Sequence, residues 1–219
     1  MSFIPRQIIQ NLFEQLNSSD IEYVLIKNIS DELPEKLKDG KDIDILVHES
    51  NIKKFEKFMK THNFKKRVHP YGRRKEWSFA YKLPEHQFWQ FNDNNFTLYI
   101  DVSFKLCCRS LTPKVWIPLD NCINEDIWKN KIFDKKNKWW ILNEENLLVY
   151  LICRSVFDKK EFRLDYITEI EKRKSLLKQK SVRLKISKVF FKYTDSLILQ
   201  IEDSNYENII SNYLSFKNY

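Results

Sequence analysis

Residues 41–47 read KDIDILV, and this segment decides most of what the sequence predicts. Its composition is that of a buried β-strand, because apolar residues such as Ile43 and Ile45 recur at every second position. Side chains alternate between the two faces of a strand, so Asp42 and Asp44 project together from the other face. Two adjacent carboxylates repel one another, and partial burial makes the repulsion costly. A divalent cation removes that cost, which makes this pair a candidate site for Mg²⁺ or Mn²⁺.

A third carboxylate interrupts a later strand-like run, FTLYIDVSFKL at 96–106. Apolar and polar residues alternate there, and Asp101 belongs to the polar set. If this strand lies beside 42–47, Asp101 completes a cluster with Asp42 and Asp44. Three carboxylates can hold two metal ions about 3.5–4 Å apart, an arrangement that activates an attacking hydroxyl and stabilises a leaving pyrophosphate. We therefore expect these three residues to be both the metal ligands and the catalytic residues.

The glycine content excludes two classes of nucleotide-binding protein. Gly40 and Gly72 are the only glycines among 219 residues. A Walker-type phosphate loop needs two glycines at fixed close spacing, and a dinucleotide-binding fingerprint needs three. The chain has 38 Lys and Arg against 30 Asp and Glu, a net charge of +8. This excess favours an anionic partner, whether nucleotide phosphates, nucleic acid or a membrane surface.

Apolar periodicity predicts an α+β fold in two parts. A mixed sheet flanked by helices occupies residues 1–138, and a helical bundle occupies residues 139–219. The predicted helices are 4–17, a short helix between Pro34 and Gly40, 51–62, one that Asn143 caps, 163–178, 182–201 and 205–216. The predicted strands are 21–27, 42–47, 77–83, 86–91 and 96–106. The stretch 107–138 reads as irregular.

Composition also bears on localisation. No run of about 18 apolar residues is present, so no transmembrane helix is expected, and the charged start of the chain reads as structure rather than as a signal peptide. The four cysteines have neither zinc-site nor disulfide spacing. They are Cys107, Cys108, Cys122 and Cys153. We expect buried thiols and a cytoplasmic protein.

Taken together, these segments resemble the nucleotidyltransferase superfamily, which has the polymerase-β-like fold. Members carry a Gly-Gly or Gly-Ser pair after the first strand, D-x-D on the second and another Asp on a later strand. Here EYVLIK, KDIDILV and LYIDVSF hold those places. The stretch YVLIKNISDELPEKLKDGKDIDILV is most similar to bacterial nucleotidyltransferases encoded beside surface-polysaccharide genes, and also looks like the small lincosamide and aminoglycoside nucleotidyltransferases. The resemblance covers about residues 1–170.

This resemblance implies transfer of NMP from an NTP to a hydroxyl or phosphate of a small molecule or surface-polymer precursor, with release of pyrophosphate. Asp42 and Asp44 would bind the metal that bridges the NTP phosphates, and Asp101 would bind the second metal and position or deprotonate the acceptor hydroxyl. The family's glycine pair falls near 27–30, where this chain has none. There we expect Lys27, Asn28 and Ser30 to line the phosphate side, with positive φ most readily adopted by Asn28.

Other residues invite a functional interpretation. Lys105 shares the parity of Asp101 and can face the site, and His48 shares that of Asp44. The basic run 73–75 is either a phosphate contact or a solvated turn. The four histidines, His48, His62, His69 and His86, have no metal-binding spacing.

Two alternatives stay open beside the small-molecule transferase, and a third is disfavoured. The same chemistry can act on tRNA or protein, as in toxin-like relatives, and the basic helical part favours this. The chain can also be a non-catalytic member of the fold, as the missing glycine pair indicates. A glycosyltransferase also uses D-x-D, but only 41 residues precede Asp42, too few for the nucleotide-binding region that usually comes before that motif.

Overall fold

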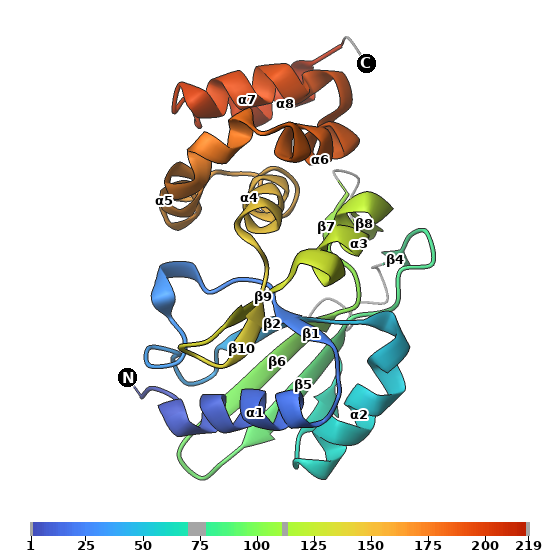
Figure 1. Ribbon diagram of the computed structural model, residues 1–219, viewed down its shortest axis with the longest axis vertical. Helices are drawn as coiled ribbons and strands as arrows, with labels where there is room; N and C mark the ends of the chain where they lie inside the picture. Colours follow the sequence, from blue (N-terminus) through green and yellow to red (C-terminus); the bar gives the residue numbers. More distant parts are fainter. Residues whose placement is uncertain (1, 70–77, 111–113, 218–219) are drawn as a thin grey trace.

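The computed structural model describes residues 2–69, 78–110 and 114–217. It has the predicted fold class, a mixed sheet flanked by helices and followed by further helices (Figure 1). The strands of the larger sheet are β1 (Tyr23–Leu25), β2 (Asp42–Val47), β3 (Lys65–Arg67), β5 (Gln87–Asn92), β6 (Thr97–Ser103), β9 (Ile132–Asp134) and β10 (Trp139–Ile141). Their order is β3-β5-β6-β2-β1-β10-β9. A smaller sheet holds β4 (Ser78–Phe79), β8 (Val115–Pro118) and β7 (Cys107–Arg109), in that order.

The helices form two groups (Figure 1). Beside the larger sheet lie α1 (Arg6–Ser18) and α2 (Ile52–Thr61). At the other end of the molecule lie α4 (Glu144–Cys153), α5 (Leu164–Arg173), α6 (Lys180–Phe190), α7 (Thr194–Glu202) and α8 (Ile209–Ser215), and α3 (Asn121–Asn130) lies between the groups. A π-helical segment, Arg154–Lys159, continues α4 directly. Within the described ranges, none of the helices has the length and apolar character needed to cross a bilayer.

Each face of the larger sheet packs against one helical group. Ile43 and Ile45 of β2 share an apolar cluster with Phe13 of α1 and Phe55 of α2. Leu46, of opposite parity, belongs to the cluster that contains α4 to α8. Because Asp42 and Asp44 have the parity of Leu46, their side chains lie on the face that turns toward the C-terminal helices.

Several expected elements are found and others are wrong. Helix α1, strand β2, helix α2 and the Asn143 cap of α4 agree with the sequence, the cap accepting a hydrogen bond from the Asn146 N–H at 2.8 Å. The stretch 107–138 is not irregular, because β7, β8, α3 and β9 lie in it. The predicted helix 182–201 is interrupted at Phe191, whose φ of 48° ends α6. Turns replace the short helix expected before Gly40, which adopts φ of 76°.

The predicted division at residue 138 falls within the larger sheet. Strand β10 pairs in parallel with β1, with Leu25 opposite Ile141. The apolar cluster of the C-terminal helices also includes Val24 and Ile26 of β1. Two domains therefore remain a prediction. Of the four free cysteines, three are buried as expected and Cys122 is exposed.

Candidate metal and nucleotide site

Three carboxylates converge on one face of the sheet. Strands β2 and β6 are parallel neighbours, and their register sets Asp44 directly opposite Asp101. Asp42 lies two residues before Asp44 on β2, so the two side chains are on the same face of the sheet. One oxygen of each carboxylate lies within 4.8 Å of the others. The structure thus brings together the three residues that the strand pattern selects.

The three charges do not have equal environments. Burial, followed by repulsion from Asp44 and Asp101, raises the pKa of Asp42 above its usual range. Burial also acts to raise the pKa of Asp44, but the positive charges of Lys27 and Arg154 outweigh it and lower the pKa. Lys27 Nζ lies 2.7 Å from Asp44 Oδ2. The cluster therefore carries an excess of negative charge, which Lys27 and Arg154 compensate only in part.

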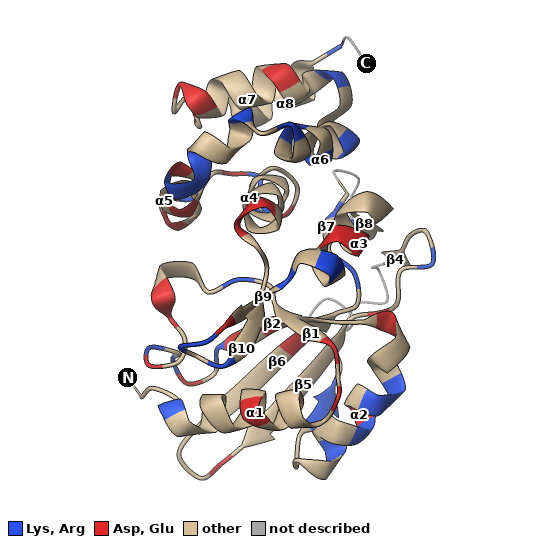
Figure 2. Cartoon of the chain, in the orientation of Figure 1, with Lys and Arg blue, Asp and Glu red and all other residues tan. Residues whose placement is uncertain are grey.

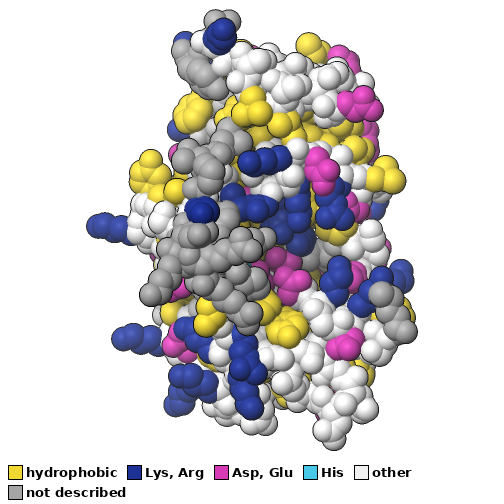
Figure 3. Space-filling view, turned by 180° about the vertical axis from the view of Figure 1, so that it is seen from behind, with side chains coloured by type: hydrophobic (Ala, Val, Ile, Leu, Met, Phe, Trp, Pro, Cys, Tyr) yellow, Lys and Arg dark blue, Asp and Glu magenta, His cyan; other side chains and the backbone are white. Residues whose placement is uncertain are grey.

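Cations from the C-terminal helices face this cluster. Arg154, Lys159 and Arg163 belong to the π-helical segment and the turn before α5, and all three line the same cavity as the carboxylates. The pKa of Lys159 is lowered by burial and then by repulsion from Arg154 and Lys27. Figure 3 shows Lys and Arg side chains gathered with acidic ones midway along one face of the molecule. Positive charge is therefore crowded on the wall opposite the carboxylates.

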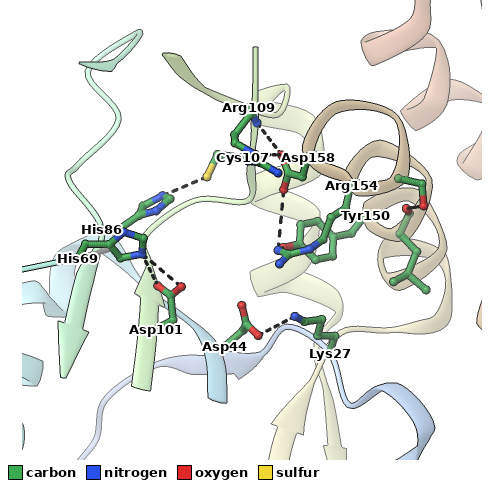
Figure 4. A network of polar contacts seen from close by, with 12 residues as sticks. Lys27, Asp44, His69, His86, Asp101, Cys107, Arg109, Tyr150, Arg154 and Asp158 are labelled. Atoms are coloured by element: carbon green, nitrogen blue, oxygen red, sulfur yellow. Dashed lines mark hydrogen bonds and ion pairs between the residues drawn. The ribbon is translucent and has the colours of Figure 1, made fainter. Parts of the chain in front are cut away.

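Arg154 is held by a network of polar contacts (Figure 4). Its Nη1 donates to the Tyr150 hydroxyl at 2.6 Å and lies 3.9 Å from Asp158 Oδ2. Asp158 Oδ1 accepts from the backbone N–H of Arg109 at 2.7 Å. Burial raises the pKa of Asp158, so its negative charge depends on these partners. The network fixes the guanidinium of Arg154 toward Asp44.

The cavity between the two walls has a volume of about 880 Å³, within the size range of small-molecule sites. The carboxylates form one side and the cations another. Phe88 and Tyr99 add an aromatic surface, with ring centroids 5.0 Å apart and planes 13° from parallel. Carboxylates, cations and stacked rings around one cavity fit the metal, phosphate and base of a nucleotide.

Only two of the three residues predicted for the phosphate side line the cavity. Lys27 and Asn28 line the cavity. Asn28 does not use its capacity for positive φ, because its φ is −137°. Its side-chain amide instead accepts from the Leu33 N–H at 2.8 Å and donates to the Leu33 carbonyl at 3.1 Å. Positive φ occurs at Ser30 (58°) and Asp31 (50°), and Ser30 is exposed and is not a lining residue of the cavity.

The remaining candidates do not line the main cavity or lie outside the described residues. Lys105 Nζ is 3.5 Å from Glu49 Oε1, and Lys105 lines a smaller adjoining cavity. His48 contacts Ser50 and the ring of Trp128, and it lines neither cavity. The basic run 73–75 lies outside the described residues.

Two groups of residues escaped the sequence analysis. The cations of the C-terminal part are one group, and only Arg154 had a local signal, a charge directly after the apolar run LLVYLIC. The other group is His69 and His86, which are buried beside Asp101. Their proximity depends on strand pairing and has no signal in sequence spacing.

Comparison with known protein families finds no match for this chain, and no curated protein matches it. Its function has to be inferred from the site itself.

Proposed function

We propose that the protein is a metal-dependent nucleotidyltransferase that moves NMP from an NTP to a hydroxyl or phosphate of a small molecule or surface-polymer precursor. The observation that carries the proposal is the pairing of Asp44 with Asp101, beside Asp42, across a cavity from Arg154 and Lys159. A nucleoside triphosphate with its metal presents positive charge to the carboxylates and negative charge to the cations. Both walls are then compensated by one ligand.

The carboxylates suit a divalent ion because nearby cations compensate their repulsion only in part, as the raised pKa of Asp42 indicates. Oxygen-only ligands on neighbouring strands are what Mg²⁺ and Mn²⁺ prefer. When bound, the metal neutralises phosphate charge and favours attack by the acceptor oxygen. Asp42 and Asp44 would hold one metal ion on the phosphate side, and Asp101 would hold a second on the acceptor side.

The protein's own residues position the substrates. Lys27, Arg154 and Lys159 neutralise the triphosphate and hold it in line for attack at the α-phosphorus. The acceptor oxygen forms the new bond to that phosphorus, the bond to pyrophosphate breaks, and Asp101 receives the hydroxyl proton. Phe88 and Tyr99 offer a stacking surface for the base.

The test measures Mg²⁺-dependent NTP binding and pyrophosphate release with each of the four NTPs and with hydroxyl- and phosphate-bearing acceptors. Asp42→Asn and Asp101→Asn should each reduce release by at least about 100-fold, since each removes a charge that acts directly in the transition state. Asp203→Asn is the matched control, because Asp203 is an exposed carboxylate at the end of α7. Full activity in both site variants would overturn the proposal.

Repeating the assay at several salt concentrations separates a small acceptor from tRNA. Lys and Arg are spread over α2, α5 and α6 (Figure 2), so their distribution does not decide the acceptor. Affinity for a polyanion falls steeply with salt, whereas affinity for a small neutral acceptor changes little. We expect weak salt dependence.

A further inference from the structure

A second group of potential metal ligands adjoins the three carboxylates. Nitrogens of His69 and His86 and an oxygen of Asp101 lie within 4.8 Å of one another. His69 Nε2 is 3.3 Å from both oxygens of Asp101. Asp101 is thus common to this group, the histidine triad, and to the carboxylate cluster (Figure 4).

Strand pairing explains why the triad forms. Strands β3 and β5 are antiparallel, with Arg67 opposite Phe88. His69 lies two residues past Arg67 and His86 two residues before Phe88, so the two histidines occupy facing positions just beyond the ladder. Phe88 in turn pairs with Asp101 on β6. The pairing of β3, β5 and β6 therefore brings the three residues of the triad together.

The two rings are enclosed. His69 is 8% and His86 is 7% exposed. The His86 ring lies 4.8 Å from that of Trp116, centroid to centroid, and its Nε2 lies 3.2 Å from Cys107 Sγ. Such contacts orient a ligating ring before an ion arrives.

There is also room for an ion. A cavity of about 50 Å³ is lined by all three members of the triad, and a water molecule needs only about 10–15 Å³ on this measure. Zn–N and Zn–O bonds near 2.0–2.1 Å separate tetrahedral ligands by about 3.4 Å. The three ligand atoms, which lie within 4.8 Å of one another, would have to approach to that separation around an ion.

We propose that His69, His86 and Asp101 form a second metal site that takes a divalent transition-metal ion such as Zn²⁺, with Asp101 bridging it to the carboxylate cluster. Two imidazoles and one carboxylate select such ions over Mg²⁺, which prefers oxygen ligands. Three protein ligands leave one position for water or substrate, as in catalytic rather than structural zinc sites. The site does not depend on nucleotidyl transfer.

Zinc titration of the chelator-treated full chain tests the site. We expect one Zn²⁺ per chain, bound more than about 100-fold more weakly by His69→Ala and by His86→Ala, beyond the usual effect of losing a supporting contact. His62→Ala is the matched control, since its Nδ1 contacts the Phe58 carbonyl at the end of α2, and it should bind as the wild type does. Asp42→Asn should also bind Zn²⁺ normally. Loss of Zn²⁺ binding in Asp42→Asn, with retention in the histidine variants, would overturn the proposal.

A measurement on the wild type avoids dependence on variants that misfold. X-ray absorption at the zinc edge, with one equivalent of Zn²⁺, should show two imidazole ligands, and a shell of oxygen ligands alone would refute the site. If imidazole ligation is found but no NTP is turned over with Mg²⁺, the histidine triad stands and the transferase proposal fails. If turnover is found without imidazole ligation, the transferase proposal stands and the histidine triad fails as a metal site.

Discussion

Asp42 is a carboxylate whose negative charge is disfavoured in the metal-free protein. Burial and the neighbouring Asp44 and Asp101 raise its pKa, so the folded state loses stability as pH rises through that pKa. The residue as a whole is exposed, although its carboxyl group is partly desolvated. Allowing for solvent screening, we expect Asp42→Asn to raise the Tm of the metal-free protein at pH 7 by about 1–3 °C. Near pH 3 the carboxyl is protonated in both the folded and unfolded states, and the gain should vanish. Thermal melts at the two pH values check this.

Magnesium should reverse the order of stability of the wild type and Asp42→Asn. An ion that binds only the folded state raises its stability with concentration, and Asp42→Asn lacks one ligand. We expect Mg²⁺ to raise the Tm of the wild type and to have little effect on the variant. An equal Mg²⁺ response in both would place the ion elsewhere.

Ser30 has a backbone conformation that suits glycine. Its φ of 58° and ψ of 26° are left-handed, and it lies in the segment where the resembled family has its glycine pair. A β-branched residue is strained there, so Ser30→Val should lower the free energy of unfolding by about 1–2 kcal/mol. Ser18→Val is the control, since Ser18 is also exposed but lies in α1. Denaturant melts should show the control within about 0.5 kcal/mol of the wild type.

At the scale of elements, Lys185 joins three helices. This buried residue of α6 has Nζ 2.7 Å from Asp126 Oδ2 on α3 and 3.1 Å from Glu145 Oε2 on α4. Lys185→Met keeps most of the packing but leaves two carboxylates without their cation. We expect a loss of about 2 kcal/mol at pH 7, below the cost of breaking a fully buried pair because both carboxylates are partly exposed. Lys188→Met, an exposed position on the same helix, should cost little in the same denaturant melts.

The pKa of Asp126 determines how the stability difference between the wild type and Lys185→Met changes with pH. Burial acts to raise its pKa, but hydrogen bonds from Lys185 and Asn146 lower it. A lowered pKa contributes stability above the unfolded value of about 3.9 and loses it as pH falls through the folded pKa. The difference between wild type and Lys185→Met should therefore be full at pH 6–7 and shrink below about pH 4. A constant difference down to pH 2 would contradict this role.

Elements with a strong local pattern were predictable, and those with a weak local pattern were not. Strand β2 and the shared face of its two aspartates follow from alternation alone. Helix α3 was missed because its core residues, Ile123 and Ile127, are few within a polar stretch. The break at Phe191 carries neither Gly nor Pro, so no sequence signal marks it.

In the candidate site, prediction is limited by the pairing and packing of distant segments. Asp101 could be placed beside Asp44 only on the condition that their strands were neighbours, which the structure satisfies. The histidine triad needs the register of three strands, and the cationic wall needs the packing of the C-terminal helices on the sheet. Neither can be read from spacing, because the residues are far apart in the chain.

At the scale of the whole molecule, one apolar cluster connects the sheet with the C-terminal helices. Val24 and Leu46 of the sheet share it with Leu148 and Ile152 of α4, so neither part can expose this surface without cost to the other. We expect one cooperative unfolding transition. All six tryptophans lie at or before Trp140, so their fluorescence reports on the sheet part, while far-ultraviolet circular dichroism reports mainly on helices. The two denaturant curves should coincide, and two separated midpoints would show instead that the parts before and after residue 138 unfold as independent domains.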